Sequence, residues 1–340
     1  MSFLDTLKRS KKVHYLLKVF KYINDEEYVS FFLDRETNPL LLEFKSYGKE
    51  NMQNRFYVIN ETGRGYGFFA EVHALLAKLA FADLFKFTPI VSWGKEFLYY
   101  EEKEVNAFES YFKQPTSFTL EDIKKSRFVA FSKIAQGAWI EQNLEKGADI
   151  SPSYERMMGE VYKKYIFLND NIQKKLDEET KSILQNKKTL GVHFRGTDFK
   201  MNYDNHPVAV TIEQEFEAID QAMKLYDFEQ IFLATDEIRA VDKFKEKYGL
   251  QIVCYSDVFR GDTNVSVAFS QSDRENHRYQ LGYEVLRDMY TLSLCDGFIA
   301  GISQVSICAR IAKRARDEEY KYLKIIDNGK NHNGKQFIGK

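Results

Sequence analysis

The second half of the chain alternates between short apolar runs and longer amphipathic stretches. The apolar runs, which predict strands, lie at residues 190–194, 231–234, 250–255, 298–300 and 322–326. The amphipathic stretches, which have helical periodicity, lie at residues 211–226, 239–248, 277–294 and 305–316. Strands that are apolar throughout and alternate with helices are typical of a parallel sheet covered on both faces. The pattern therefore predicts an α/β fold for this half.

The same order of elements occurs once earlier in the chain. Apolar runs at 56–59 and 89–91 flank a helical pattern that starts at Phe68, which predicts a second βαβ unit. We place the boundary between two domains in the polar stretch near residue 185. The predicted domains are residues 1–185, with helical additions, and residues 186–340.

A glycine-rich turn joins the first of these runs to its helix. It contains Gly63, Gly65 and Gly67. The turn lacks the Lys-Ser/Thr ending of a P-loop, its third glycine is one position early for G-x-G-x-x-G, and no acid follows the next strand. An NAD-dependent enzyme is therefore disfavoured. The glycines either let a ligand approach the backbone closely or form a tight turn between strand and helix.

Composition and charge exclude several classes of protein. The 49 basic side chains nearly balance the 50 acidic ones, which argues against a nucleic-acid binder. The three cysteines, Cys254, Cys295 and Cys308, are widely spaced and suggest neither a disulfide framework nor a zinc cluster. No apolar stretch approaches the ~20 residues that span a bilayer, and no signal peptide is visible. We therefore expect a cytoplasmic protein, at most peripheral to the inner face of the membrane.

Residues 1–24 depart from this balance. They carry six basic side chains against one acid, with apolar residues at helical spacing among them. Such a segment either rests on an anionic membrane surface or packs on its domain as an ordinary amphipathic helix. Membrane contact is kept here as a hypothesis.

Motifs of other enzyme classes are missing from the sequence. There is no D-x-D pair, no H-E-x-x-H and no complete G-x-S-x-G elbow. Neither metal catalysis nor a serine hydrolase has positive support. We therefore expect no metal site.

Polar side chains follow several of the predicted strands. Arg195 and Asp198 follow the first strand of the second half, Asp236 follows the second, and Ser303 and Ser306 follow the fourth. Ligands of open parallel sheets bind at this edge. An arginine there can clamp a phosphate with two hydrogen bonds, and a helix start offers free N–H groups to an anion. An Arg–Asp pair that closes a loop, and ordinary helix caps, are the simpler interpretations.

Two further residues belong to the same candidate site. Asp288 lies in the helix before the fourth strand, where a carboxylate can accept both N–H groups of a guanine edge or be a solvated helix position. His193 lies inside the first strand, and such a histidine is more often a core residue than a ligand.

Three segments together resemble the GT-B fucosyltransferase superfamily, particularly the α1,6-fucosyltransferases. They are residues 191–198 (GVHFRGTD), 231–237 (IFLATDE) and 288–306, from Asp288 to Ser306. The resemblance implies two Rossmann-like domains that face a cleft, with residues 1–185 on the acceptor side and residues 186–340 as the nucleotide-sugar-binding domain. It also implies a GDP-fucose donor held mainly by the C-terminal domain, and inverting transfer with no metal or other cofactor.

The resemblance also implies roles for single residues. Arg195 would contact the diphosphate, His193 and Asp288 the guanine, and Ser303 or Ser306 a phosphate, while Asp198 and Asp236 would order the pocket. The sequence departs from the family at Gly196, where the family has a second arginine, and at Glu237, where it has an aspartate.

The family places a lysine and then an acid after the first motif. Lys200 and Asp204 match this if one residue has been inserted. We predict Asp204 as the general base for the acceptor hydroxyl, because a carboxylate beside the sugar can take that proton. Glu213 and His206 are competing candidates, and a solvated loop acid is the simplest alternative.

The function predicted from the sequence is transfer of fucose from GDP-fucose to a glycan or lipid-linked glycan. Two alternatives stay open: the same fold with another nucleotide-sugar donor, or a non-catalytic nucleotide- or carbohydrate-binding protein. Fold alone does not decide among them.

Overall fold

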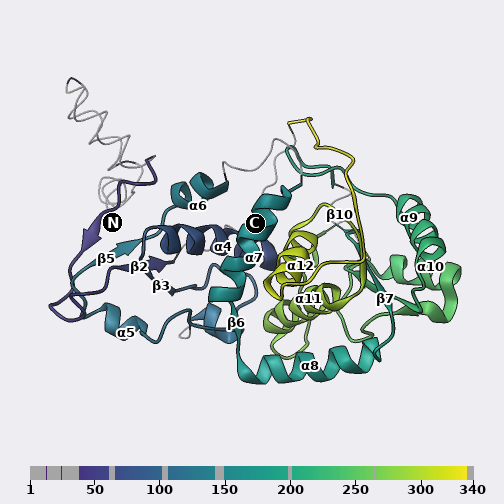
Figure 1. Ribbon diagram of the computed structural model, residues 1–340, viewed down its shortest axis with the longest axis horizontal. Coiled ribbons are helices and arrows are strands. Elements are labelled where there is room, and N and C mark those ends of the chain that lie inside the picture. Colours follow the sequence, from purple (N-terminus) through teal and green to yellow (C-terminus); the bar gives the residue numbers. More distant parts are fainter. Residues whose placement is uncertain are drawn as a thin grey trace.

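The computed structural model describes residues 38–60, 66–101, 106–141, 149–197, 201–262 and 265–334, together with the single residues 13 and 24. Its strands form two main sheets that lie side by side (Figure 1). A short pair, β4 (Phe112–Lys113) and β6 (Phe167–Leu168), is antiparallel.

The N-terminal sheet has the order β1-β5-β2-β3. Its strands are β1 (Phe44–Lys45), β2 (Phe56–Ile59), β3 (Thr88–Val91) and β5 (Val129–Phe131). β2 pairs in parallel with both β3 and β5, and β1 is antiparallel to β5. The helix α4 (Phe68–Leu84) connects β2 to β3. The βαβ unit predicted for this part of the sequence is therefore confirmed.

The C-terminal sheet has the order β11-β10-β7-β8-β9 and is parallel throughout. Its strands are β7 (Thr189–Phe194), β8 (Gln230–Thr235), β9 (Ile252–Val253), β10 (Gly297–Gly301) and β11 (Tyr322–Ile326). The chain builds outward from β7 to β9 on one side, then returns to place β10 on the other side of β7. The strand order thus reverses between β7 and β10, which is where ligands bind in such sheets.

Helices cover both faces of this sheet. They are α9 (Ile212–Leu225), α10 (Ile238–Tyr248), α11 (His277–Leu294) and α12 (Gln304–Ala315). Alternate residues of β7, such as Val192, pack in one apolar cluster with residues of α9 and α10 such as Ile219 and Phe244. His193 lies on the other face, within hydrogen-bond distance of Ser303. The apolar strand predicted at 190–194 therefore carries one polar group toward the α12 side.

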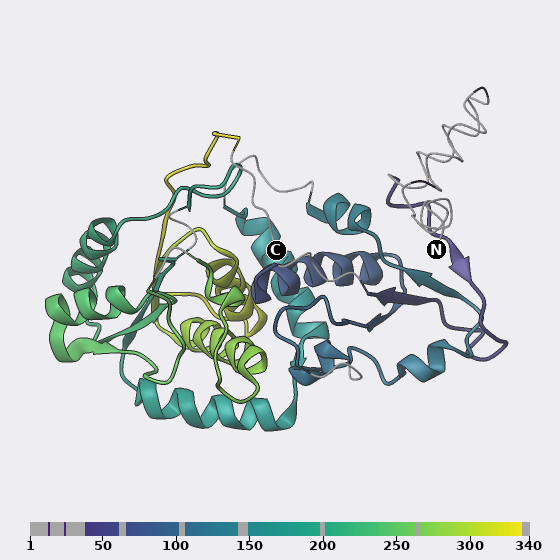
Figure 2. The ribbon, with the colours of Figure 1, turned by 180° about the vertical axis from the view of Figure 1, so that it is seen from behind.

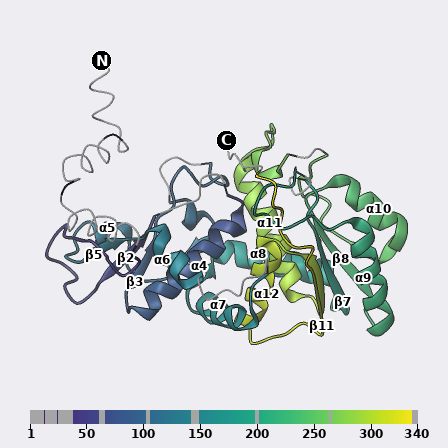
Figure 3. The same cartoon turned by 90° about the horizontal axis from the view of Figure 1, so that it is seen from above.

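The two sheets share a continuous core. α7 (Pro152–Tyr165) and α8 (Asp170–Leu184) lead from one sheet to the other, and α4, α7 and α12 lie between them (Figure 3). Leu76 of α4, Met158 of α7 and Ile311 of α12 belong to a single buried apolar cluster. Seen from behind, α8 runs along one border of the molecule (Figure 2). Three short helices, α5 (Leu120–Ile123), α6 (Ile134–Glu141) and the 3₁₀ helix Ala107–Ser110, complete the N-terminal part.

The predicted α/β class with two units is confirmed by the strand order, and the helix over 277–294 begins and ends as predicted. The strand predicted at 250–255 was too long, because Gly249–Gln251 form a 3₁₀ turn and only Ile252–Val253 pair. The boundary near residue 185 stays a prediction. Within the described ranges, none of the helices is long and apolar enough to cross a membrane. The basic segment 1–24 lies outside the described residues, apart from Val13 and Asn24.

Candidate functional site

A pocket of about 570 Å³ opens at the carboxyl ends of β7, β8 and β10. The C-terminal half of the chain supplies most of the lining, which includes His193, Arg195, Asp236, Asp288 and Ser303. The start of α4 supplies Gly67, Phe68 and Phe69 from the N-terminal part. Six of the residues predicted from the sequence, Gly67 among them, therefore meet in one pocket, at the point where the strand order reverses.

Arg195 and Asp236 form the charged centre of this pocket. Arg195 Nη1 lies 3.0 Å from Asp236 Oδ2, and the Gly196 N–H and the Thr197 hydroxyl both donate to the same carboxylate at 2.8 Å. Burial by itself would raise the pKa of Asp236, but the Arg195 guanidinium and these two donors hold it below its usual value. Asp236 thus stays ionised and fixes the guanidinium that it faces.

His193 is neutral in this arrangement. Burial, together with the Arg195 cation, lowers the pKa of His193 to about 4. Its Nδ1 lies 3.3 Å from the Ser303 hydroxyl oxygen. With Nδ1 at Ser303, the neutral imidazole has Nε2 as its second polar atom, so His193 can hold a polar ligand group without adding charge.

The two serines predicted at the start of α12 have different roles. They form a reciprocal cap in which Ser306 N–H donates to Ser303 Oγ (3.1 Å) and Ser303 N–H donates to Ser306 Oγ (3.0 Å). Ser306 Oγ also donates to the carbonyl of Gly301 at 2.9 Å, and Ser306 does not line the pocket. Ser303 does line it. Ser306 therefore shapes the turn, whereas Ser303 lies where the start of α12 meets the pocket.

Asp288 is buried on α11 without a complete set of hydrogen bonds. Asp288 is 8% exposed, and its Oδ1 has no hydrogen-bond partner among the residues that the structure describes. Burial raises the pKa of Asp288 to about 7, although the cations of Arg260 and Arg287 act in the opposite direction. A buried polar atom without a partner is costly and is a mark of a site that a ligand completes.

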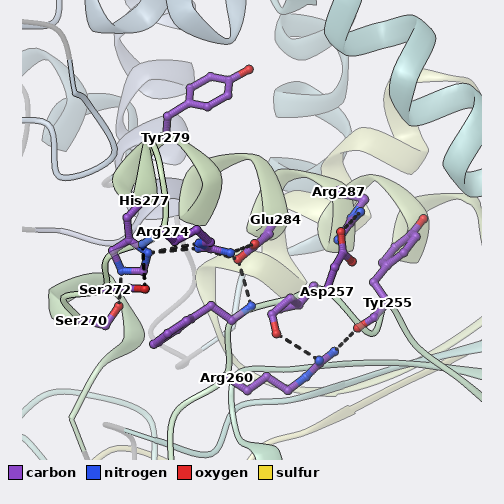
Figure 4. Close-up of polar contacts among 12 residues, drawn as sticks. Tyr255, Asp257, Arg260, Ser270, Ser272, Arg274, His277, Tyr279, Glu284 and Arg287 are labelled. Atoms are coloured by element: carbon purple, nitrogen blue, oxygen red, sulfur yellow. Dashed lines mark hydrogen bonds and ion pairs between the residues drawn. The ribbon is translucent and has the colours of Figure 1, made fainter.

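The two arginines near Asp288 are held by other groups (Figure 4). Arg287 pairs with Asp257 and with Glu179, the latter at 3.1 Å. Arg260 donates to backbone carbonyls, including those of Thr235 (3.2 Å) and Tyr255 (2.9 Å). Neither guanidinium is therefore paired with Asp288, and the carboxylate remains available to the pocket.

The long connection from β9 to α11 supplies an apolar wall that sequence reasoning missed. Val258, Phe259 and residues 266–269 of this connection line the pocket. Glu284 of α11 fixes it, because its carboxylate accepts from the Phe259 N–H (3.1 Å) and pairs with Arg274 (Figure 4). Glu284 looks in the sequence like any acid of an amphipathic helix, so no signal singled it out.

His277 lies beside this ion pair. Its Nε2 is 2.9 Å from the Ser270 hydroxyl, and Arg274 Nε donates to its Nδ1 at 3.3 Å. Burial and the Arg274 cation lower the pKa of His277. The neutral ring therefore links the helix start to the apolar wall.

The predicted base, Asp204, does not line the pocket. Its Oδ1 accepts from the backbone N–H groups of Asn333 and Gly334, and these hydrogen bonds lower the pKa of the carboxyl. Both features weaken Asp204 as a proton acceptor. Of the competing candidates, Glu213 lies at the start of α9 outside the lining, whereas His206 is part of the lining.

Four predicted site residues lie outside the described part of the chain. They are Asp198, Lys200, Gly63 and Gly65. Among the residues that the structure does describe, no group of three His, Cys, Asp or Glu side chains could hold a metal ion.

Comparisons with known proteins give structural similarities at low sequence identity. No family model matches the chain, and no curated protein matches it. A crystal structure of the α-1,6-fucosyltransferase NodZ with GDP is 17% identical, covers 77% of this chain and 92% of its own, and has a TM-score of 0.48. A crystal structure of fucosyltransferase NodZ from Bradyrhizobium is 16% identical, covers 77% of this chain and 93% of its own, and has a TM-score of 0.46. A crystal structure of POFUT1 in complex with GDP is 12% identical, covers 80% of this chain and 98% of its own, and has a TM-score of 0.45.

Proposed function

We propose that the pocket binds the nucleoside diphosphate of a sugar donor and that the protein is an inverting, metal-independent glycosyltransferase. The observation that carries the proposal is the placement of an unpartnered buried carboxylate, Asp288, in the same pocket as a fixed guanidinium, Arg195. A purine with two adjacent N–H donors suits the first group, and a diphosphate suits the second.

The base is proposed to lie against the apolar wall and to donate to Asp288. Guanine presents adjacent N–H groups, and a carboxylate accepts both of them. Val258, Phe259 and Val285 supply apolar surface in the same pocket. Adenine and uracil lack this pair of donors, so Asp288 would favour GDP.

The diphosphate is proposed to lie between Arg195 and the start of α12. Charge grows on the leaving phosphate as the bond to the sugar breaks, and a preorganised cation stabilises that charge most strongly where water is excluded. Asp236 holds the guanidinium in place before the reaction begins. This electrostatic contribution, rather than covalent catalysis, is the main part that we assign to the chain.

The sugar is proposed to be fucose because of the three sequence segments that resemble fucosyltransferases. The acceptor is proposed to be a glycan or glycolipid-like molecule that enters from the side where Phe68 and Phe69 line the pocket. We assign the acceptor proton to His206, because this candidate base lines the pocket whereas Asp204 does not.

A donor panel tests this function. GDP-fucose, GDP-mannose and UDP-sugars are incubated with the full chain, and release of the nucleoside diphosphate is measured with and without EDTA. The proposal predicts turnover of GDP-fucose that survives EDTA. Preference for another sugar would point to the alternative donor, binding without turnover to a non-catalytic protein, and absence of any nucleotide binding would contradict all three.

The basic segment 1–24 is proposed to contact an anionic membrane, which would suit a lipid-linked acceptor. Co-sedimentation with vesicles that contain an anionic lipid should decrease when residues 1–24 are deleted. Unchanged co-sedimentation would exclude this contact.

A further inference from the structure

The chain beyond β11 returns to the pocket. Residues 327–334, which we call the C-terminal strap, run antiparallel to residues 204–208 (Figures 1 and 2). Three backbone hydrogen bonds join the two segments: Val208 N–H to Gly329 O (2.8 Å), Asn331 N–H to His206 O (2.9 Å), and Asn205 N–H to Asn331 O (2.9 Å). The strap is therefore attached to the loop that follows β7, the strand that carries Arg195.

Side chains at both ends add to this attachment. Asn328 Nδ2 donates to the carbonyl of Ala209 at 3.1 Å, and Asn333 Nδ2 donates to the carbonyl of Asn202 at 2.7 Å. Gly329 has a φ of +81°, which is the left-handed conformation that glycine adopts at little cost. The strap thus has a defined path and is not merely the end of the chain.

Asp204 fixes the far end of the strap. Its Oδ1 accepts from the N–H groups of Gly334 (3.1 Å) and Asn333 (2.8 Å). Hydrogen bonds from backbone N–H groups to an ionised carboxylate are among the stronger ones. Asp204, which the sequence predicted as the general base, therefore joins the loop after β7 to the end of the C-terminal strap.

Lys330 lies in the middle of the strap and forms part of the pocket lining. Its backbone forms an isolated antiparallel β-bridge with Pro207. Asn205, His206 and Pro207 line the same pocket. No described carboxylate forms an ion pair with Lys330. Its ammonium group is consequently available to a ligand.

Two other charged groups of the pocket, Arg195 and Glu284, are already paired. Arg195 faces Asp236, and Glu284 faces Arg274. A nucleoside diphosphate brings several negative charges, which Arg195 alone, already shared with Asp236, neutralises only in part. The Lys330 ammonium would offset part of the negative charge of the diphosphate that Arg195 leaves unneutralised.

Position 196, directly after Arg195, has no room for a second cationic side chain. A Cβ atom at Gly196 would lie 2.1 Å from Glu237 Oε2 and 2.7 Å from Glu237 Cβ. No side chain fits there unless Glu237 moves. A second cation must therefore come from a position other than 196.

We propose that Lys330 is the second cationic contact for the donor diphosphate and that Asp204 is a positioning residue that holds the strap carrying it. This inference rests on the proposed function, because it assumes that the pocket binds a nucleoside diphosphate. It assigns a binding role to a segment without any recognisable motif.

Calorimetric titration of Lys330→Met with GDP and with guanosine tests the role of Lys330. Loss of a charge-assisted contact should weaken GDP binding about tenfold and leave guanosine binding unchanged, because guanosine carries no phosphate. Lys330→Arg should restore most of the affinity for GDP. Lys324→Met is the matched control, since Lys324 is an exposed lysine of β11 outside the pocket lining.

The possible failures are distinguishable. If the unaltered chain binds neither GDP nor guanosine, the proposed function falls, and this inference falls with it. If the chain binds GDP and Lys330→Met binds it equally well, the inference is overturned while the proposed function stands. Equal loss of GDP and guanosine would show a structural effect and would also overturn it.

The positioning role of Asp204 is tested by Asp204→Asn alone and combined with Lys330→Met. The single variant should weaken GDP binding several-fold without affecting guanosine, and it should add no further loss in the Lys330→Met background. Residues that act through one another show this non-additivity. Additive losses would overturn the positioning role, and Asp227→Asn, at an exposed aspartate outside the pocket lining, is the control.

Discussion

The two main sheets of this protein differ in the side chains that follow the carboxyl ends of their strands. At the end of β3, amide side chains satisfy the backbone: Gln114 Oε1 accepts from Val91 N–H (3.0 Å), and Asn106 Oδ1 accepts from Trp93 N–H (2.9 Å). At the ends of β7 and β8, the corresponding positions carry Arg195 and Asp236, which face a pocket. Similar βα patterns can therefore end in two ways. We call the end of β3, where side chains satisfy the backbone, the sealed edge, and the ends of β7 and β8, which face the pocket, the open edge.

A buried carboxylate oxygen lacks a hydrogen-bond partner among the described residues at the open edge, whereas the amide side chains at the end of β3 are fully hydrogen-bonded. Asp288 Oδ1 is buried without a partner beside the C-terminal sheet. Asn106 at the N-terminal sheet uses both its oxygen and its nitrogen, since its Nδ2 also donates to Val91 O at 2.7 Å. Unsatisfied buried groups cost stability, so their presence indicates where a ligand is expected.

The largest expected effect comes from Arg195→Ala. Removing the guanidinium takes away the main diphosphate contact and leaves Asp236 buried without its cation, so GDP affinity should fall about 100-fold, or about 3 kcal/mol. Calorimetry measures this. Arg127→Ala, at an exposed arginine next to β5 of the sealed sheet, should leave GDP binding unchanged. Equal effects of the two substitutions would remove the distinction between the sheets.

A pH titration of GDP binding should give the next largest effect. The pKa of Asp288 is about 7 in the free protein, and only the ionised carboxylate accepts both guanine N–H groups. GDP affinity should therefore be highest above pH 7 and fall up to about tenfold for each pH unit below it. Asp288→Asn should bind GDP weakly and without this dependence. A dependence that persists in Asp288→Asn would assign the titration to another group.

Much of the open edge was predictable from the sequence. His193, Arg195, Asp236 and Ser303 each lie at the end of an apolar run, and parallel strands bring such ends together. The contribution of Lys330 was not predictable, because it follows the last strand and reaches the pocket only through long-range pairing with residues 204–208. Periodicity reports local structure and carries no signal for such pairing.

The prediction for Asp204 shows a second limit. The resemblance placed an acid at the expected spacing after the first motif, but spacing does not determine which groups reach a carboxylate. Two N–H groups from residues more than 125 positions away do so here. Glu284 gave the opposite error, since its ordinary helical pattern concealed its contact with the Phe259 N–H.

A pair of glycine substitutions provides a sharper structural comparison. Gly196→Ala should lower the free energy of unfolding by about 1–2 kcal/mol and weaken GDP binding, because its Cβ would collide with Glu237. Gly94→Ala in the N-terminal part meets nothing within 4 Å and should change stability by less than about 0.5 kcal/mol. Chemical denaturation of both variants measures the difference, and similar values for the two would contradict the crowding at Gly196.

The smallest expected effect concerns the sealed edge. Asn106→Ala leaves the Trp93 N–H without its partner and removes one of the two donors to the Val91 carbonyl, which Gln114 Nε2 still serves at 2.7 Å, so the free energy of unfolding should fall by about 1 kcal/mol. GDP affinity of the folded variant should not change, because Asn106 does not line the pocket. Loss of GDP binding by a folded Asn106→Ala protein would show that the N-terminal sheet takes part in donor recognition.

A crystal structure of the full chain with GDP tests the central claim most directly. The account predicts the diphosphate between Arg195 and the start of α12, the guanine N–H groups on Asp288, and the Lys330 ammonium within hydrogen-bond distance of a phosphate oxygen. GDP bound at the end of the N-terminal sheet, or in the pocket with its base away from Asp288, would contradict it.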